Sequence, residues 1–193
     1  MSEIKVGGAD LSITSTGFAR SDGTTGLITT KQDDGDRRII VIRNRLLIEL
    51  EDVDVVVLED FPARLQAAAA KAIGILQGAV RSELMSRGIP YVVVPPSTLK
   101  KYAADNGNAT KSDMAMAAYK RAGREFEKDK GGDQADAWWL RRAGLEQYGM
   151  PLDFELPAGQ RAALDKVDWT KPARYCPVCA GLSPMLHRNC VLR

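Results

Sequence analysis

The most constraining feature of the sequence is a pair of short, continuously apolar segments on either side of a long helical pattern. The segments are VDVVVLED at 53–60 and IPYVVVPP at 89–96. Strands that are covered on both faces read as unbroken apolar runs. Between them, residues 65–84 repeat apolar side chains at steps of three and four, which predicts a long helix closed by Gly88. The pattern therefore predicts two buried parallel strands joined by a helix.

Three shorter segments precede this unit and have turn residues between them. Residues 4–10, 15–20 and 26–32 predict strands of an antiparallel meander. Helices are expected at 37–50, at 99–106 with a cap from Ser97 or Thr98, at 111–127 and at 133–147. The order of elements predicts an α/β fold with a mixed five-stranded sheet, in which helices flank a three-strand meander and parallel strands.

Bulk composition is that of a soluble, globular chain. The 193 residues are 45% hydrophobic and 27% charged, with a net charge of +2. The sequence has no apolar run of about 20 residues and no signal-peptide layout, so we expect a cytoplasmic protein. The character of the chain changes near Pro151, which predicts a domain at 1–150 and an extension at 151–193.

Four acidic side chains fall where such a sheet has its functional edge. Asp10 and Glu59 end predicted strands, and Asp133 and Asp136 begin the last predicted helix, three residues apart on one face. Carboxylates gathered in one place repel one another unless a cation neutralises them, and their hard oxygen atoms suit Mg²⁺ or Mn²⁺. Acids at strand ends and helix starts are also common without any function.

Five motifs in order resemble the RuvC family of Holliday-junction resolvases, within the RNase H-like nuclease superfamily. They span residues 4–145 and read GADLSITSTGFA, VVVLEDF, LQAAAAKAIGILQGAVRSEL, VPPSTLKKYAADNGNATKSDM and DQADAWWLR. The resemblance implies an RNase H-like fold in which Asp10, Glu59, Asp133 and Asp136 are catalytic and hold two Mg²⁺ or Mn²⁺ ions. It also implies a homodimeric endodeoxyribonuclease that hydrolyses phosphodiesters in branched DNA.

Other functions remain open at this stage. A relative with broader specificity would cut flaps, Y-forks or single strands, and a non-catalytic relative would only bind junctions. A sugar-kinase or actin-like phosphotransferase also places an aspartate after its first strand, but it needs a second phosphate loop in a longer chain. A divergent resolvase with an added tail would suit a bacterial cell, or one infected by a bacteriophage.

The predicted DNA contacts lie around the acidic residues. Residues 1–150 carry 21 basic and 21 acidic side chains, so sequestering four acids at a metal leaves the basic ones in excess. We expect the ring of Phe61 to stack on an unpaired base, although it could equally belong to the core. Backbone phosphates are expected to contact Arg64, Lys100, Lys101 and Lys111. Lys120, Arg121 and Arg124 are instead expected to form a solvated helix face.

The extension contains a second candidate metal site. Cys176, Cys179, His187 and Cys190 form a C-x2-C-x7-H-x2-C pattern that includes every cysteine and the only histidine of the chain. Four nitrogen and sulfur ligands at this spacing favour a closed, structural Zn²⁺ site. An odd number of cysteines without an export signal argues against disulfides. The alternative is unrelated cysteines and a surface histidine.

Overall fold

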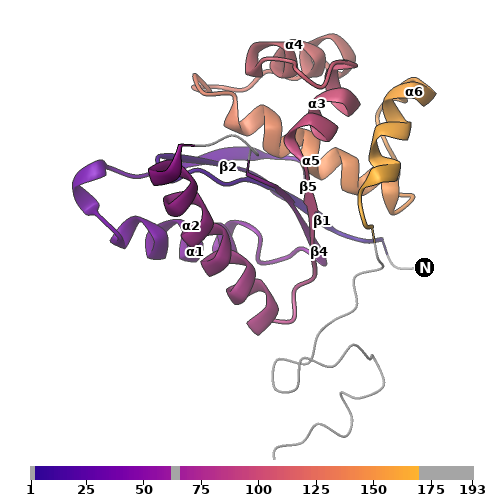
Figure 1. The fold of residues 1–193 in the computed structure, drawn as a ribbon. Coiled ribbons are helices and arrows are strands. Elements are labelled where there is room, and N and C mark those ends of the chain that lie inside the picture. Colours follow the sequence, from indigo (N-terminus) through magenta and orange to yellow (C-terminus); the bar gives the residue numbers. More distant parts are fainter. Residues whose placement is uncertain (1–2, 62–65, 170–193) are drawn as a thin grey trace, which may run out of the picture.

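The structure, a computed structural model, describes residues 3–61 and 66–169 (Figure 1). Its centre is a five-stranded sheet that consists of β1 (Val6–Asp10), β2 (Ser15–Ala19), β3 (Thr25–Thr29), β4 (Val55–Glu59) and β5 (Tyr91–Val94). The strand order is β3-β2-β1-β4-β5. The first three strands form an antiparallel meander, while β4 runs parallel to β1 and β5. This confirms the predicted mixed sheet.

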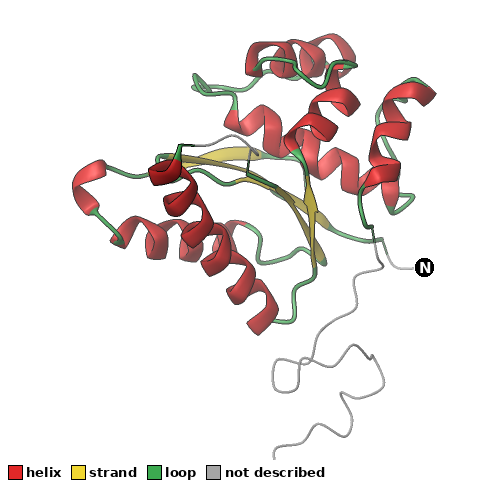
Figure 2. Cartoon of the chain, viewed as in Figure 1, coloured by secondary structure: helices red, strands yellow, loops and turns green. Residues whose placement is uncertain are grey.

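Helices cover both faces of the sheet. They are α1 (Arg37–Glu49), α2 (Ala67–Ser86), α3 (Pro96–Ala104), α4 (Lys111–Ala122), α5 (Asp133–Gln147) and α6 (Ala158–Arg161), with the 3₁₀ turns η1 (Gln32–Asp34) and η2 (Ala162–Lys166). Helices α1 and α2 lie on one face, and α3 to α6 lie on the other (Figures 1 and 2). Within the described ranges, no helix has the length and apolar character needed to cross a membrane.

Each face of the sheet carries its own hydrophobic cluster. In β4, Val55 and Val57 point into the cluster shared with α3, α4 and α5. Val56 and Leu58 point the opposite way, into the cluster shared with α1 and α2. Successive side chains of a strand face opposite sides, so a strand covered on both sides needs apolar residues throughout. This explains the unbroken apolar run Val55–Leu58 within residues 53–60.

Helix α5 approaches the sheet at two glycines. A Cβ atom on Gly8 of β1 would lie 2.1 Å from the carbonyl oxygen of Ala137, and a Cβ on Gly17 of β2 would lie 2.0 Å from that of Asp133. Neither distance is compatible with a side-chain carbon, and both contacts are with backbone that cannot rotate away. The absence of side chains at these two positions therefore sets how close the first turns of α5 lie to β1 and β2.

Two details of the helices differ from the sequence-based expectation. The predicted cap of the helix after β5 is wrong, because α3 begins at Pro96 and holds Ser97 and Thr98 in its first turn, without a side-chain cap. Proline suits this position, since its φ is already helical and it lacks an N–H that would need a partner. Helix α4 ends at Ala122 because Gly123 adopts a left-handed conformation, with φ of 62°.

Residues 154–169 pack against the main domain. The ring of Phe154 stacks on Trp138 of α5 with a centroid distance of 6.3 Å, and Leu156 and Leu164 are buried in the cluster on that face. The first part of the predicted extension therefore shares the core of residues 1–150. The four predicted zinc ligands, Cys176, Cys179, His187 and Cys190, lie outside the described residues.

The glycine contacts predict that Gly17→Ala is destabilising. The added methyl group forces α5 away from β2, and overpacking of this kind costs about 1–3 kcal/mol in the free energy of unfolding, measured by urea denaturation. Gly159→Ala is the matched control, because no heavy atom lies within 4 Å of its Cβ position, and it should change stability by less than about 1 kcal/mol. Equal effects of the two substitutions would contradict the proposed role of Gly17.

Candidate active site

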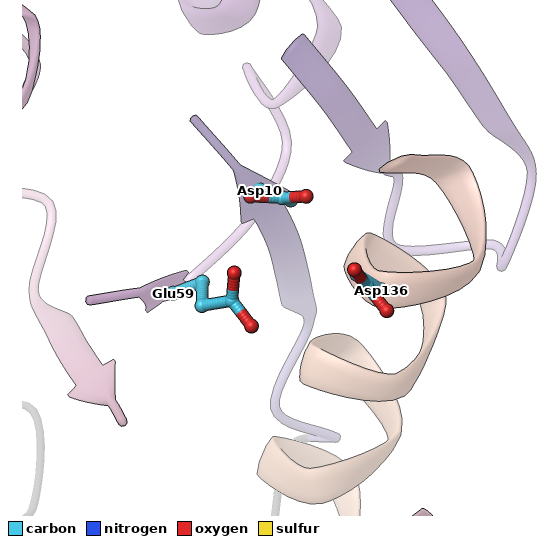
Figure 3. A group of neighbouring side chains, drawn as sticks. All are labelled: Asp10, Glu59 and Asp136. Carbon is cyan, nitrogen blue, oxygen red and sulfur yellow. The ribbon is translucent and has the colours of Figure 1, made fainter. Parts of the chain in front are cut away.

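Three carboxylates meet at one edge of the sheet. Asp10, Glu59 and Asp136 each offer an oxygen atom, and these atoms all lie within 4.8 Å of one another. The three side chains come from the end of β1, the end of β4 and the first turn of α5, and they point toward a common centre (Figure 3). They are the one group of metal-ligating side chains at this spacing within the described ranges.

Parallel pairing of β1 and β4 brings the first two acids together. Ala9 pairs with Leu58, so the next residues, Asp10 and Glu59, leave the sheet side by side. The carboxyl ends of parallel strands share an edge, which is where α/β sheets bind ligands. Gln77 of α2 donates from Nε2 to the carbonyl oxygen of Glu59 at 3.0 Å and is buried, with 3% exposure. The sequence pattern did not single out this polar residue in an otherwise apolar helix stripe.

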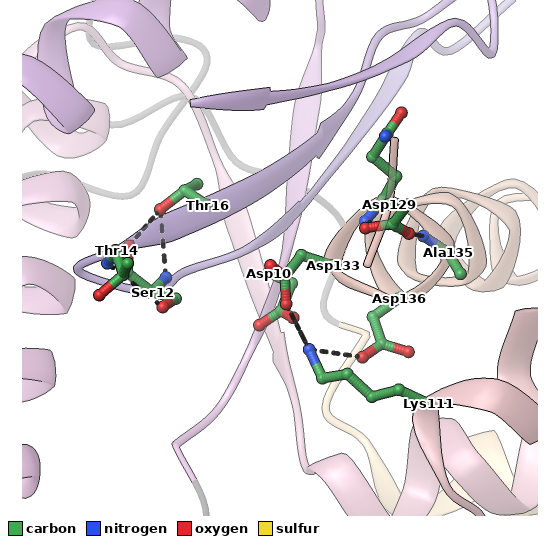
Figure 4. A network of polar contacts seen from close by, with 10 residues as sticks. Asp10, Ser12, Thr14, Thr16, Lys111, Asp129, Asp133, Ala135 and Asp136 are labelled. Carbon is green, nitrogen blue, oxygen red and sulfur yellow. Dashed lines mark hydrogen bonds and ion pairs between the residues drawn. The ribbon is translucent and has the colours of Figure 1, made fainter. Parts of the chain in front are cut away.

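The start of α5 supplies the other two acids. Helix α5 begins after Gly132, which is left-handed with φ of 75°. Its first amides are capped from outside by Asp129, whose Oδ2 accepts from the N–H groups of Gln134 and Ala135 at 3.0 and 3.1 Å (Figure 4). Asp133 is 8% exposed beside the cluster, and Asp136 is 2% exposed within it. Asp129 was missed in the sequence, where its only signal is an acid shortly before a helix start.

Lys111 enters the acidic cluster from α4. Its Nζ lies 3.0 Å from Asp10 Oδ2, 2.5 Å from Asp133 Oδ1 and 3.3 Å from Asp136 Oδ2 (Figure 4). Helix α4 is fixed to α5 by a hydrogen bond from Trp139 Nε1 to the carbonyl oxygen of Met114, at 3.0 Å. From the sequence, Lys111 was expected to contact the DNA backbone, whereas the structure pairs it with the acids.

The turn after Asp10 is held by its own hydroxyl groups. The side chain of Thr16, which is fully buried, accepts from the N–H of Ser12 at 3.1 Å and donates to the carbonyl oxygen of Ser12 at 2.7 Å (Figure 4). These two bonds close the short connection between β1 and β2. The small hydroxyl residues after Asp10 thus fix the turn beside the carboxylates.

Burial dominates the electrostatics of the cluster. It raises the pKa of Asp10 despite the opposing attraction of Lys111. Burial, followed by the charges of Asp10 and Asp136, raises the pKa of Glu59 well above its usual value. For Asp136, burial and then the charge of Asp10 raise the pKa to about 7. Desolvation opposes the charge of Lys111, but Asp10 and Asp136 together raise its pKa overall. The cluster thus holds more negative charge than one ammonium group balances.

The chemistry of the donor set fits a hard divalent cation. All three converging groups are carboxylates, the ligands that Mg²⁺ and Mn²⁺ prefer. Oδ1 of Asp136 is also buried without a hydrogen-bond partner in the described part of the chain. A buried carboxylate oxygen without a partner is costly, and a cation bound between Asp10, Glu59 and Asp136 would satisfy it.

The other predicted site residues are spread around this edge. Phe61, two residues after Glu59, is 42% exposed, so it does not belong to the core. Lys100 is partly buried and Lys101 is exposed on α3, where Lys101 Nζ pairs with Asp105 at 2.6 Å. Arg64 lies outside the described residues. The roles of these residues in DNA binding stay predictions, as does the zinc site.

The fold was compared with solved structures. Thermus thermophilus RuvC superposes with a TM-score of 0.59 and 22% sequence identity, over 75% of this chain and 96% of that chain. The chain has a RuvC-like fold. T. thermophilus RuvC in complex with a Holliday junction substrate gives a TM-score of 0.58 at 22% identity, over 70% of this chain and 89% of that chain. The yeast mitochondrial Holliday junction resolvase Ydc2 is more distant, with a TM-score of 0.43 at 17% identity, over 76% and 82% of the two chains.

The likeness to RuvC lies in the fold. No protein-family model matches the sequence, and no curated protein matches it.

The raised pKa of Asp136 predicts a pH-dependent stability in metal-free protein. The pKa is about 7 in the folded chain against an ordinary 3.8, so the folded state binds a proton that the unfolded state has released. The free energy of unfolding should therefore fall as the pH rises from about 4 to about 7. Asp136→Asn cannot ionise and should make this decline shallower, as measured by urea denaturation in EDTA at about pH 5 and about pH 8.

The control for this measurement is Asp33→Asn, at an exposed acid in η1, which should keep the wild-type decline. If Asp136→Asn also kept it, the carboxyl group of Asp136 would not be a source of electrostatic strain.

Proposed function

We propose that the chain is a metal-dependent endonuclease that hydrolyses phosphodiesters in branched DNA, such as four-way junctions. The convergence of Asp10, Glu59 and Asp136 on one centre carries this proposal, because two buried carboxylates and a partly buried one, with one oxygen that has no hydrogen-bond partner among the described residues, suit a divalent cation. The RuvC-like fold supports it, since one of its neighbours is a RuvC bound to a Holliday junction substrate. The motif order that resembles RuvC supports it independently.

In this proposal Asp10, Glu59 and Asp136 hold Mg²⁺ or Mn²⁺, and Asp133 completes the set. Two such ions, when bound, activate a water molecule and stabilise the leaving oxygen of a phosphodiester. The chain contributes rigid positioning, because two parallel strands and a capped helix fix the three carboxylates. Water adds to the phosphorus atom, the bond to one ester oxygen breaks, and that oxygen takes up a proton.

Lys111 has two roles in this proposal. Without a metal, its ammonium group offsets part of the negative charge of Asp10, Asp133 and Asp136. A cation held by these carboxylates would repel the ammonium group, and the Lys111 side chain, which is 44% exposed, could then turn outward to a backbone phosphate of the DNA. This reconciles its position among the acids with its predicted DNA contact.

The exposed residues beside the site suit a distorted DNA substrate. The ring of Phe61 is 42% exposed next to Glu59 and would stack on an unpaired base. Lys100, Lys101 and Arg64 would contact backbone phosphates, which position DNA without reading its sequence. To contact a phosphate, Lys101 would have to leave its exposed ion-pair partner Asp105. This costs little, because surface ion pairs of this kind contribute only about 0.2–1 kcal/mol to stability.

A two-fold symmetric junction needs two active sites, so we also propose that the chain acts as a homodimer. The outward face of α2 supports this. Ile75, Gly78, Ser82 and Met85 share one helix face, with Ile75 48% exposed and Met85 44% exposed. No heavy atom lies within 4 Å of the Cβ position of Gly78, which leaves room for the helix of a second copy.

The nuclease proposal predicts that substitutions of the adjacent acids Glu59 and Asp60 have different effects on the rate of DNA cleavage. Glu59→Gln should lower the rate of junction cleavage at least about 100-fold, because it removes a ligand of the proposed metal. Asp60→Asn is the matched control and should cleave like wild type, since Asp60 points to Arg81 and lies outside the cluster. The assay incubates four-way, Y-shaped and linear DNA with Mg²⁺ or Mn²⁺.

The substrates in this assay separate the alternatives. Cutting of the four-way DNA alone indicates a strict resolvase, and cutting of Y-shaped DNA as well indicates a structure-tolerant endonuclease. Binding of junctions without cutting under any metal would contradict the nuclease proposal and favour a non-catalytic junction-binding protein.

The dimer proposal predicts that Ile75→Arg dissociates the protein. Sedimentation at micromolar concentration should give a dimer for wild type and a monomer for the variant, because a charge would be buried at the shared face. Met116→Arg on α4, which alters a methionine of 50% exposure, should remain dimeric. A monomeric wild type, alone and bound to a junction, would contradict the proposal.

A further inference from the structure

A polar cavity, separate from the carboxylate cluster, lies beside the C-terminal half of α5. Its volume is about 360 Å³, and its lining includes the turn between β2 and β3, the end of α4 and residues 151–154. It shares no lining residue with the carboxylate cluster. Three arginines line it: Arg124, which follows α4, and Arg141 and Arg142 on α5.

The three guanidinium groups converge on the turn between β2 and β3 and on the loop after α5. Arg124 Nη2 donates to the carbonyl oxygen of Gly23 at 3.3 Å, and Arg141 Nη1 lies 3.5 Å from the Cβ position of the same glycine. Arg141 Nη2 donates to the carbonyl oxygen of Ser21. Arg142 is only 4% exposed and stacks on Phe154, with 3.7 Å between its Cζ and the ring centroid.

These arginines have carbonyl oxygens as partners but no carboxylate. None of the three forms an ion pair within the described residues, and the Nε atoms of all three are buried without a hydrogen-bond partner there. Desolvation lowers the pKa of Arg141 and of Arg142, which reflects the cost of burying their charge. Buried cations are stabilised when an anion joins them. The three guanidinium groups therefore have no carboxylate at ion-pair distance within the described residues, although Asp22 and Asp153 attract Arg141 from farther away.

Two acids, Asp22 and Asp153, line the same cavity but form no ion pair with the arginines. The carboxylate of Asp22 is exposed and already accepts from the N–H and the hydroxyl group of Thr24, at 2.8 and 2.7 Å. Asp153 is also exposed. The cavity thus keeps an excess of one positive charge, with Arg142 at its most buried point.

We propose that this cavity binds the phosphate group of a nucleotide, either free or within a DNA strand. Guanidinium groups bind phosphate oxygens in pairs of hydrogen bonds. A volume of about 360 Å³ exceeds what a lone phosphate fills, which leaves room for the attached sugar or base. The proposal stands on the arginines and does not require the carboxylates to be catalytic.

The test uses the full chain in EDTA, with calorimetric titration of inorganic phosphate and of 5′-deoxyadenosine monophosphate at fixed ionic strength. Saturable binding is expected, with the mononucleotide tighter than phosphate. Arg124→Gln and Arg141→Gln should each weaken it about tenfold or more, the usual effect of losing a charged hydrogen bond. Arg121→Gln is the matched control, because it removes an exposed arginine of α4 that lies outside this cavity.

A cavity-filling variant tests whether weaker binding in the arginine variants comes from the cavity itself, and not from a general loss of positive charge or of folding. Ala122→Tyr keeps all three arginines but fills the cavity from its rim, so it should also abolish mononucleotide binding while circular dichroism stays unchanged. Absence of saturable binding to wild type, together with unchanged DNA affinity in the variants, would overturn the proposal. So would an equal loss of binding in Arg121→Gln.

The two sources of the nucleotide give different results with a duplex probe in EDTA. If the phosphate belongs to DNA, each arginine variant lowers duplex affinity and reduces the slope of log affinity against log salt by about one. If it belongs to a free nucleotide, the variants lose mononucleotide binding and keep duplex affinity. Failure of the nuclease proposal would leave both results unchanged, because cleavage is not measured.

Discussion

The close contact between α5 and the β1–β2 pair is the constraint on which the candidate active site depends. At Gly8 and Gly17 the backbone of the helix lies where a side chain would otherwise begin, so the helix can settle directly on the two strands. This contact brings Asp133 and Asp136 to the edge where Asp10 and Glu59 already end parallel strands. Four acids from three separate segments of the sequence become neighbours through backbone packing, before any ligand is involved.

That packing has an electrostatic cost, which links the fold to the proposed function. Burial and mutual repulsion raise the pKa values of Asp10, Glu59 and Asp136, and the ammonium group of Lys111 offsets only part of the repulsion. A structure that needed these side chains only for stability would do better with apolar residues. This electrostatic cost supports the proposal of a bound cation, whose binding energy would compensate for it. The arginine cavity on the same helix repeats this logic with the opposite sign of charge.

The sequence predicted the parts of this structure that depend on local patterns. Unbroken apolar runs indicated the buried strands, helical spacing indicated α1, α2 and α5, and strand ends indicated Asp10 and Glu59 as neighbours. It did not predict contacts that tertiary packing decides. Nothing near Lys111 indicates that its Nζ lies among acids from two other elements, and Arg124 was assigned to a solvated face although it lines a cavity. Asp129 was also missed, because it caps α5 from a loop rather than from the usual cap position.

The most direct test of the account is to soak crystals of the protein in MnCl₂ and to record the anomalous diffraction signal of manganese. The account predicts a peak bounded by oxygen atoms of Asp10, Glu59 and Asp136, at about 2.0–2.2 Å from each ligand, with Lys111 turned out of the cluster. The account would be contradicted if, at saturating Mn²⁺, no anomalous peak lay between the carboxylates and they kept their arrangement around Lys111.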